Sequence, residues 1–180
     1  MEHELQARIK LERPGIQTVN GSDRKTEFEV FAQLAMSQDA YPRSPKALLG
    51  GFAHLRRFID KIRLRNAGKI QDYNYMTVGF DKHLIDFLRI DPKAFEQRVL
   101  AGGADHDFLA WVMDHGVSLT QGEIAQWNEK LLSAGPADDA ALQRFQGRLQ
   151  DIARKRKVAV SALPSVSTWA DLIELDEERL

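Results

Sequence analysis

Helix-start signatures that follow one another in the middle of the chain constrain its fold more than any other feature. Asp81, Asp91 and Asp105 each stand where a carboxylate can cap the first turn of a helix. Thr120 and Glu123 have the spacing of a capping box, in which each side chain bonds the backbone of the other residue. Because the segments between these starts are short, the helices are expected to pack as neighbours. The sequence therefore predicts a mainly α-helical fold.

The clearest apolar stripe predicts a long helix over residues 46–67. One helix face carries apolar residues at spacings of four and three: Leu48, Phe52, Leu55, Ile59 and Ile62. Ser44-Pro45 is typical of a helix start, and Gly68 is typical of a helix end. Two glycines, Gly50-Gly51, fall inside the pattern and would each cost about 1 kcal/mol relative to alanine. Either something approaches them closely or the helix begins after them.

Further helices complete the predicted domain. Apolar spacing from residue 26 predicts a helix that Tyr41-Pro42 ends, and the apolar face of residues 142–152 predicts a long helix that closes in the basic run 154–157. A last short helix is predicted to begin at Thr168. About seven helices should therefore form one compact, single-domain bundle over residues 22–180.

Residues 1–21 form an extension with a different pattern. Every second residue is apolar at four positions: Leu5, Ala7, Ile9 and Leu11. This is the period of a β-strand, and turn signals at Pro14-Gly15 and Asn20-Gly21 favour a short strand or hairpin, although a poor helix fits the same stretch. Strands of this kind can pair across a two-fold axis, so the extension is a candidate homodimer contact.

Composition excludes several kinds of chemistry. The chain has no cysteine, which removes disulfides, thiolate nucleophiles and cysteine-ligated metals. It has no paired histidine motif for a metal, no glycine-rich phosphate loop and no serine nucleophile elbow, so we expect neither a metal nor a cofactor. The net charge of −1 argues against nucleic-acid binding by the whole molecule. Charged residues from the second position onward, and no apolar run near the ~18 residues needed to span a bilayer, predict a cytoplasmic protein without a membrane segment.

Ionisable residues gather on the predicted long helix. Residues 43–69 contain eight lysines and arginines and one acid, a local balance of 8 − 1 = +7. At 100° per residue, Arg56, Asp60 and Arg63 share one flank of the apolar stripe, while Lys61 points to the opposite face. This is the densest group of charges in the sequence and the place where a functional site is most strongly indicated.

Three interpretations of this basic helix remain open. The first is an exposed face with ordinary ion pairs, each stabilising by about 0.3–0.5 kcal/mol. The second is an anion site, in which Asp60 orients Arg56 or Arg63 toward a carboxylate or phosphate. The third is a contact within the chain, because residues 171–180 carry five acids and one arginine that could cover the helix.

The anion site leads to the favoured functional hypothesis, a protein that binds an anionic small molecule, or a small enzyme acting on one. Arginine or lysine would hold the anion, an aspartate would orient it or accept a proton, and the aromatic segment 72–79 would line the pocket. The candidate ligand-binding residues are Arg56, Asp60, Lys61, Arg63, Tyr75 and Asp81. The alternative is a protein-interaction or weak nucleic-acid-binding module that uses the basic helix face.

Short motifs also give the chain a resemblance. Arg43-Ser-Pro, Leu49-Gly-Gly and Ile59-Asp-Lys-Ile-Arg63 follow one another in this order, and Gly79-Phe-Asp81 and Trp127-Asn128 come later. In this the chain resembles a bacterial family classed as a domain of unknown function, over roughly residues 41–180. The first 40 residues lie outside the resemblance. Because the family has no established activity, the resemblance implies no functional residues.

Overall fold

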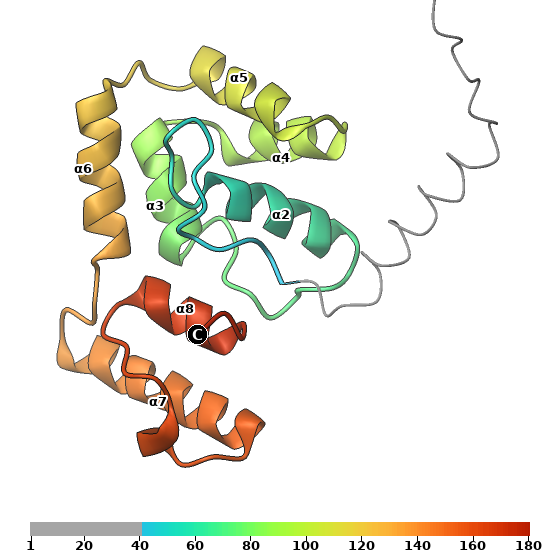
Figure 1. The fold of residues 1–180 in the computed structure, drawn as a ribbon. Helices are drawn as coiled ribbons and strands as arrows, with labels where there is room; N and C mark the ends of the chain where they lie inside the picture. Colours follow the sequence, from blue (N-terminus) through green and yellow to red (C-terminus); the bar gives the residue numbers. More distant parts are fainter. Residues whose placement is uncertain (1–40) are drawn as a thin grey trace, which may run out of the picture. The chain divides into compact units, whose positions relative to one another are not determined.

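Residues 41–180, the part of the chain that this computed structural model describes, fold into seven α-helices and the segments that connect them (Figure 1). Within these residues there is no β-strand, and only an isolated bridge pairs Leu49 with Phe52. The prediction of a mainly α-helical fold is therefore confirmed. The predicted strand or hairpin, the dimer contact and the helix from residue 26 all fall outside the described residues.

The helices are short and follow one another closely. In chain order they are α2 (Leu55–Asn66), α3 (Gly79–Leu88), α4 (Pro92–Leu100), α5 (Asp105–His115), α6 (Gln121–Leu132), α7 (Asp139–Arg156) and α8 (Trp169–Asp176), with a 3₁₀ turn, η1 (Val160–Ala162), between the last two. No helix among the described residues is long and apolar enough to cross a membrane.

Three of the predicted capping residues, Asp91, Thr120 and Thr168, cap a helix in the structure. Oδ1 of Asp91 accepts hydrogen bonds from the backbone nitrogens of the second and third residues of α4, at 2.8 and 3.2 Å. Thr120 and Glu123 form the predicted capping box at α6, and Thr168 caps α8. Asp81 and Asp105 do not cap their helices, because Val78 and Ala104 occupy the cap positions. Their carboxylates are used in tertiary ion pairs instead.

The predicted start of the long helix at residue 46 is wrong, because α2 begins at Leu55. Gly50 and Gly51 have φ angles of 58° and 88°, which a right-handed helix cannot contain. The side chain of Leu109 occupies the space that a Cβ on Gly50 would need. The close approach of Leu109 is therefore a second reason why position 50 holds a glycine. Leu48, assigned to the apolar stripe, is 49% exposed.

An amide on α6 holds the irregular segment before α2 in place. Oδ1 of Asn128 accepts a hydrogen bond from the backbone nitrogen of Ala53 at 2.9 Å, and Nδ2 donates to the carbonyl oxygen of Gly51 at 2.6 Å. The chain then enters α2 through His54, whose φ of 65° lies in the left-handed region. Long-range hydrogen bonds thus replace a regular helix in this segment.

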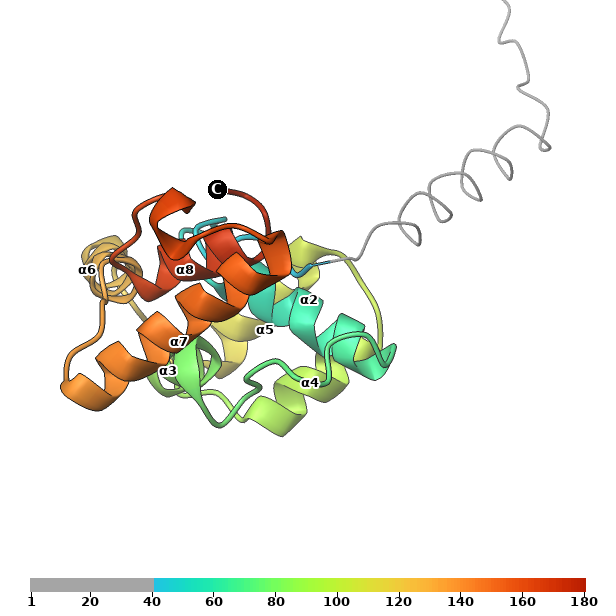
Figure 2. The ribbon, with the colours of Figure 1, turned by 90° about the horizontal axis from the view of Figure 1, so that it is seen from below.

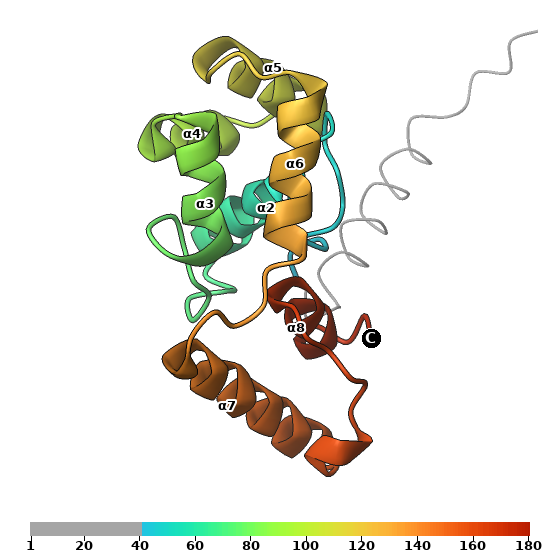
Figure 3. The ribbon, with the colours of Figure 1, turned by 90° about the vertical axis from the view of Figure 1, so that its left-hand side faces the viewer.

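Two hydrophobic clusters lie within the described residues. The larger one is built from the segment before α2 and from α2 to α6, and Phe58, Phe95 and Phe108 are fully buried in it. The smaller one joins α7 to α8 through Phe145, Ile152, Leu172 and Leu175. Helix α8 contacts both α7 and α6, and Figures 2 and 3 show it beside α7 on the side nearer to α2. Helix α8 therefore connects the C-terminal pair of helices to the larger cluster.

Candidate functional site

Asp81 lies at the centre of a buried network between α2, α3 and the loop that joins them. Its Oδ1 is 2.8 Å from Nε2 of His54, and its Oδ2 is 2.6 Å from Nζ of Lys61 and 3.1 Å from the backbone nitrogen of Met76. The side chains of His54, Lys61 and Asp81 are at most 5% exposed. Lys61 also donates to the carbonyl oxygen of Asn74. The carboxylate is therefore held by three donors in an enclosed site.

The charges in this network follow from burial and hydrogen bonding. Burial lowers the pKa of His54, and the hydrogen bond to Asp81 opposes this only in part. Burial alone would raise the pKa of Asp81, but the hydrogen bond from His54 and the nearby positive charge of Lys61 hold that pKa below its usual value. An ionised carboxylate only accepts, so Nε2 of neutral His54 must carry the proton. Its Nδ1 is then an acceptor, and it has no partner among residues 41–180.

Replacing His54 with asparagine is expected to make the free energy of unfolding less dependent on pH on the acid side of neutrality. The folded protein keeps His54 neutral, whereas the unfolded chain takes up a proton as the pH falls through about 6.5. Proton uptake favours the unfolded state, so the free energy of unfolding falls toward acid pH by at most about 1.4 kcal/mol per pH unit from this group. Urea unfolding between about pH 7.5 and about pH 5 measures the slope. Asparagine tolerates the positive φ at this position.

The variant His83→Asn is the control, because His83 is an exposed histidine on α3. The effect of His83→Asn on the pH dependence of the unfolding free energy is subtracted from that of His54→Asn. This removes the effect of losing any one imidazole. If both variants change the slope equally, or if His54→Asn leaves it unchanged, the acid sensitivity does not come from the buried histidine.

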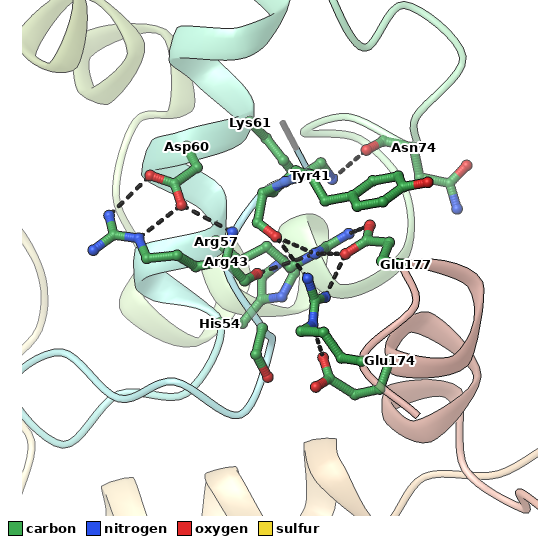
Figure 4. A network of polar contacts seen from close by, with 12 residues as sticks. Tyr41, Arg43, His54, Arg57, Asp60, Lys61, Asn74, Glu174 and Glu177 are labelled. Carbon is green, nitrogen blue, oxygen red and sulfur yellow. Dashed lines mark hydrogen bonds and ion pairs between the residues drawn. The ribbon is translucent and has the colours of Figure 1, made fainter. Parts of the chain in front are cut away.

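A second buried ion pair joins α2 to the segment that ends α8 (Figure 4). Nη1 and Nη2 of Arg57 lie 2.7 and 2.5 Å from Oε2 and Oε1 of Glu177, and the two side chains are 4% and 3% exposed. Nη1 also donates to two carbonyl oxygens in the segment before α2. Arg179 pairs with both Glu177 and Glu174. Acidic residues of the C-terminal segment therefore cover part of the basic helix, as the third interpretation of the sequence held.

Arg43 forms a third network, which is only partly buried. Its Nε and Nη2 lie 2.7 and 2.8 Å from the two carboxylate oxygens of Asp60, and its Nη1 and Nη2 lie 2.5 and 3.1 Å from those of Asp105. The hydrogen bond from Arg43 lowers the pKa of Asp105, and the charges of Arg56 and Arg63 add to this effect. Nε of Arg56 lies 3.8 Å from Asp105 and has no hydrogen-bond partner in the described part of the chain.

A surface hollow of about 210 Å³ lies next to this third network. Its lining residues are Tyr41, Asp60, Arg63 and Leu64. The guanidinium of Arg63 lies 5.1 Å from the centroid of the Phe108 ring, and its Nη2 donates to the carbonyl oxygen of Gly103 at 2.8 Å. Among residues 41–180 no carboxylate forms an ion pair with Arg63. The hollow therefore has one cation on its wall whose charge is not matched at contact distance.

Three of the six predicted ligand-binding residues come together near the hollow. Asp60 and Arg63 line it, and Arg56 lies beside Asp105. The i, i+3 spacing of Asp60 and Arg63 on one helix predicted their proximity correctly. The predicted partner of Asp60 was Arg56 or Arg63, but the structure pairs it with Arg43, which comes from the segment before the helix.

The other three predicted residues lie elsewhere. Lys61 and Asp81 pair with each other in the buried network, so the interpretation of the basic helix as an exposed face does not hold for Lys61. The hydroxyl of Tyr75 donates to Oε1 of Glu96 at 2.6 Å on α4, and the guanidinium of Arg65 lies over its ring at 4.8 Å. Tyr75 therefore packs between two helices and does not line the hollow.

Sequence reasoning missed the two residues that organise the charges. Arg43 was quoted only as part of a motif, and Glu177 only as one acid among five. A solitary arginine before a helix gives no local signal of its partner, because Asp60 and Asp105 lie 17 and 62 positions away. The described residues contain no group of three His, Asp or Glu side chains that could hold a metal ion.

Together the fold and these networks define a class, an α-helical domain whose basic helix is largely neutralised by carboxylates from other elements. The family comparison makes the assignment specific. The chain belongs to the family described as a domain of unknown function (DUF5069), which matches residues 39–179. The resemblance seen in the motifs is thereby confirmed, and the N-terminal extension lies outside the match. The curated proteins include no match to this chain.

Proposed function

We propose that this domain binds a small anionic molecule in the hollow beside Arg63. The observation that carries the proposal is the charge balance of the cluster around Asp105. Three arginines, Arg43, Arg56 and Arg63, act on Asp105 and Asp60, which gives 3 − 2 = +1. Two other cations of the basic helix, Arg57 and Lys61, are neutralised in buried pairs. The excess charge therefore lies where the described part of the helix lines a hollow.

The chemistry of the hollow suits a compact anion. Arg63 presents a planar guanidinium, which can bind a carboxylate or phosphate through two parallel hydrogen bonds. The carbonyl of Gly103 and the ring of Phe108 hold this guanidinium in place, so little side-chain entropy is lost on binding. A volume of about 210 Å³ lies below the roughly 300–1,000 Å³ typical of pockets for drug-sized ligands. The expected ligand is therefore a small carboxylate or phosphate. Asp60, which lines the hollow, is paired with Arg43.

Titration with orthophosphate and with succinate at low salt is expected to perturb the hollow in ¹H–¹⁵N NMR spectra. The largest shifts should fall on the amides of Tyr41, Arg63 and Leu64 and on the side-chain Nε–H of Arg63. Replacing Arg63 with glutamine should weaken the affinity about tenfold or more, because a charge-assisted pair is lost. The variant Arg154→Gln is the control, since Arg154 pairs with Asp151 on the exposed surface of α7.

Two outcomes would contradict the proposal. One is the absence of saturable shifts with either anion. The other is a set of shifts that Arg63→Gln and Arg154→Gln reduce equally, since that result would describe general attraction to a positive surface.

The interaction module proposed as an alternative has less support. Arg57 and Lys61, two of the cations on that helix face, are buried and paired, so they do not offer charge to a partner. For location we propose the bacterial cytoplasm, which the absence of cysteine and the resemblance to a bacterial family support.

A further inference from the structure

On the basis of the proposed function, we infer that the ligand of the hollow at Arg63 is a short dicarboxylate, whose second carboxylate binds Lys155 and the hydroxyl of Tyr41. Arg63 belongs to α2, whereas Lys155 lies near the end of α7. Tyr41 lines the hollow and also contacts Lys155, so it connects a cation of the C-terminal pair of helices to the proposed site.

The contact between Lys155 and Tyr41 leaves the phenol able to bind a ligand. Nζ of Lys155 donates a hydrogen bond to the hydroxyl oxygen of Tyr41 at 2.9 Å, and it lies 5.4 Å from the centroid of the ring. An ammonium has donors only, so this bond uses a lone pair of the phenol oxygen and not its hydrogen. Among residues 41–180 no group accepts that hydrogen. The hydroxyl can therefore donate to a carboxylate while it holds the ammonium beside it.

The charge of Lys155 is available to the same carboxylate. Lys155 is exposed, and no carboxylate in the described part of the chain forms an ion pair with it. The hydrogen bond to Tyr41 raises the pKa of Lys155, and the charges of Asp176 and Glu178 add to this effect from a distance. The side chain is therefore a cation at neutral pH whose charge is not matched at contact distance.

Two cations in different places favour a ligand with two anionic groups. Arg63 lies on the wall of the hollow, whereas Lys155 lies at the hydroxyl of Tyr41 and is not a lining residue. The planar guanidinium suits a carboxylate bound through two parallel hydrogen bonds, and the compact ammonium suits a second one. Leu64, also on the wall, offers apolar contact to the methylene groups between them. Because the hollow measures only about 210 Å³, that connecting chain must be short.

Comparing succinate with butyrate in the NMR titration tests whether the second carboxylate is bound. Butyrate has a methyl group where succinate has its second carboxylate. At matched ionic strength, succinate is expected to bind about threefold to fivefold more tightly, the gain from one exposed ion pair. Lys155→Gln should remove this preference by weakening succinate alone, and Tyr41→Phe should reduce it in the same direction. Arg63→Gln should weaken both anions, and only succinate should shift the amide of Lys155.

The matched control is Arg154→Gln, which removes the same charge from the neighbouring position of α7. Arg154 pairs with Asp151, so this change should leave the preference for succinate as it is in the wild type. Both substitutions are at exposed positions, and circular dichroism melts should show that the fold persists.

The failure of this inference is distinct from the failure of the proposed function. If Arg63→Gln weakens both anions but Lys155→Gln or Tyr41→Phe leaves the preference intact, the hollow binds an anion without a second carboxylate at Lys155, and only the dicarboxylate is ruled out. Equal effects of Lys155→Gln and Arg154→Gln would rule it out as well. If neither succinate nor butyrate binds the wild type, both proposals are wrong.

Discussion

Replacing Asp81 with asparagine is expected to lower the free energy of unfolding by about 3–5 kcal/mol, the cost of leaving a buried charge without its partner. Asp81 accepts hydrogen bonds from His54, Lys61 and the backbone of Met76. An asparagine side chain of nearly the same shape presents an NH₂ group to one of these donors. It also leaves the ammonium of Lys61 without a carboxylate in an almost fully buried position.

The same helix offers a matched control. Asp86 lies one turn and a half further along α3, and its Oδ2 is also 2.6 Å from a lysine, Lys82. These two side chains are 54% and 52% exposed, so Asp86→Asn should cost no more than about 0.5 kcal/mol. Urea unfolding of both variants at neutral pH makes the comparison. Equal losses would mean that the buried network adds no more to stability than a surface pair does.

Local signals account for the part of the fold that the sequence predicted. A cap such as Asp91 or a box such as Thr120 with Glu123 involves residues two to three positions apart, and their geometry is almost independent of the rest of the molecule. The error at α2 has a related cause. Phe52 is 1% exposed but is buried from an irregular segment, and it falls by chance on the period of the helix that follows. The spacing of apolar residues alone did not distinguish a residue buried from an irregular segment from a residue buried from a helix.

In the candidate site, too, contacts between residues close in the sequence could be predicted and contacts between distant residues could not. Asp60 and Arg63 could be placed together because they lie three positions apart on one helix. The pairs that neutralise the basic helix join residues from 17 to 120 positions apart, and a single sequence holds no local pattern for them. The excess of acids in residues 171–180 indicated that this segment could cover the helix. It did not indicate that Glu177 would be the residue buried against Arg57.

Breaking the pair between Arg57 and Glu177 should have an effect of similar size and also detach α8. Glu177→Leu leaves the buried guanidinium of Arg57 without a carboxylate and should cost about 3–5 kcal/mol. Arg57→Met should cost less, because the carboxylate of Glu177 keeps Arg179 as a partner. The double variant should lose much less than the sum of the two, because no buried charge of the pair remains. Arg179 can keep Glu174 as its partner in that variant, at 3.0 Å.

Urea unfolding of the wild type, the two single variants and the double variant gives the coupling energy, and Arg154→Met with Asp151→Leu provides the control cycle. Those two side chains are 77% and 56% exposed and should show almost no coupling. Hydrogen exchange then separates local from global effects. If Glu177 anchors α8, the amides of α8 lose protection in Arg57→Met before those of α4 do, since α4 packs in the larger hydrophobic cluster. Simultaneous loss in both helices would show that the pair supports the whole domain, and additive single losses would show that it is not a coupled pair.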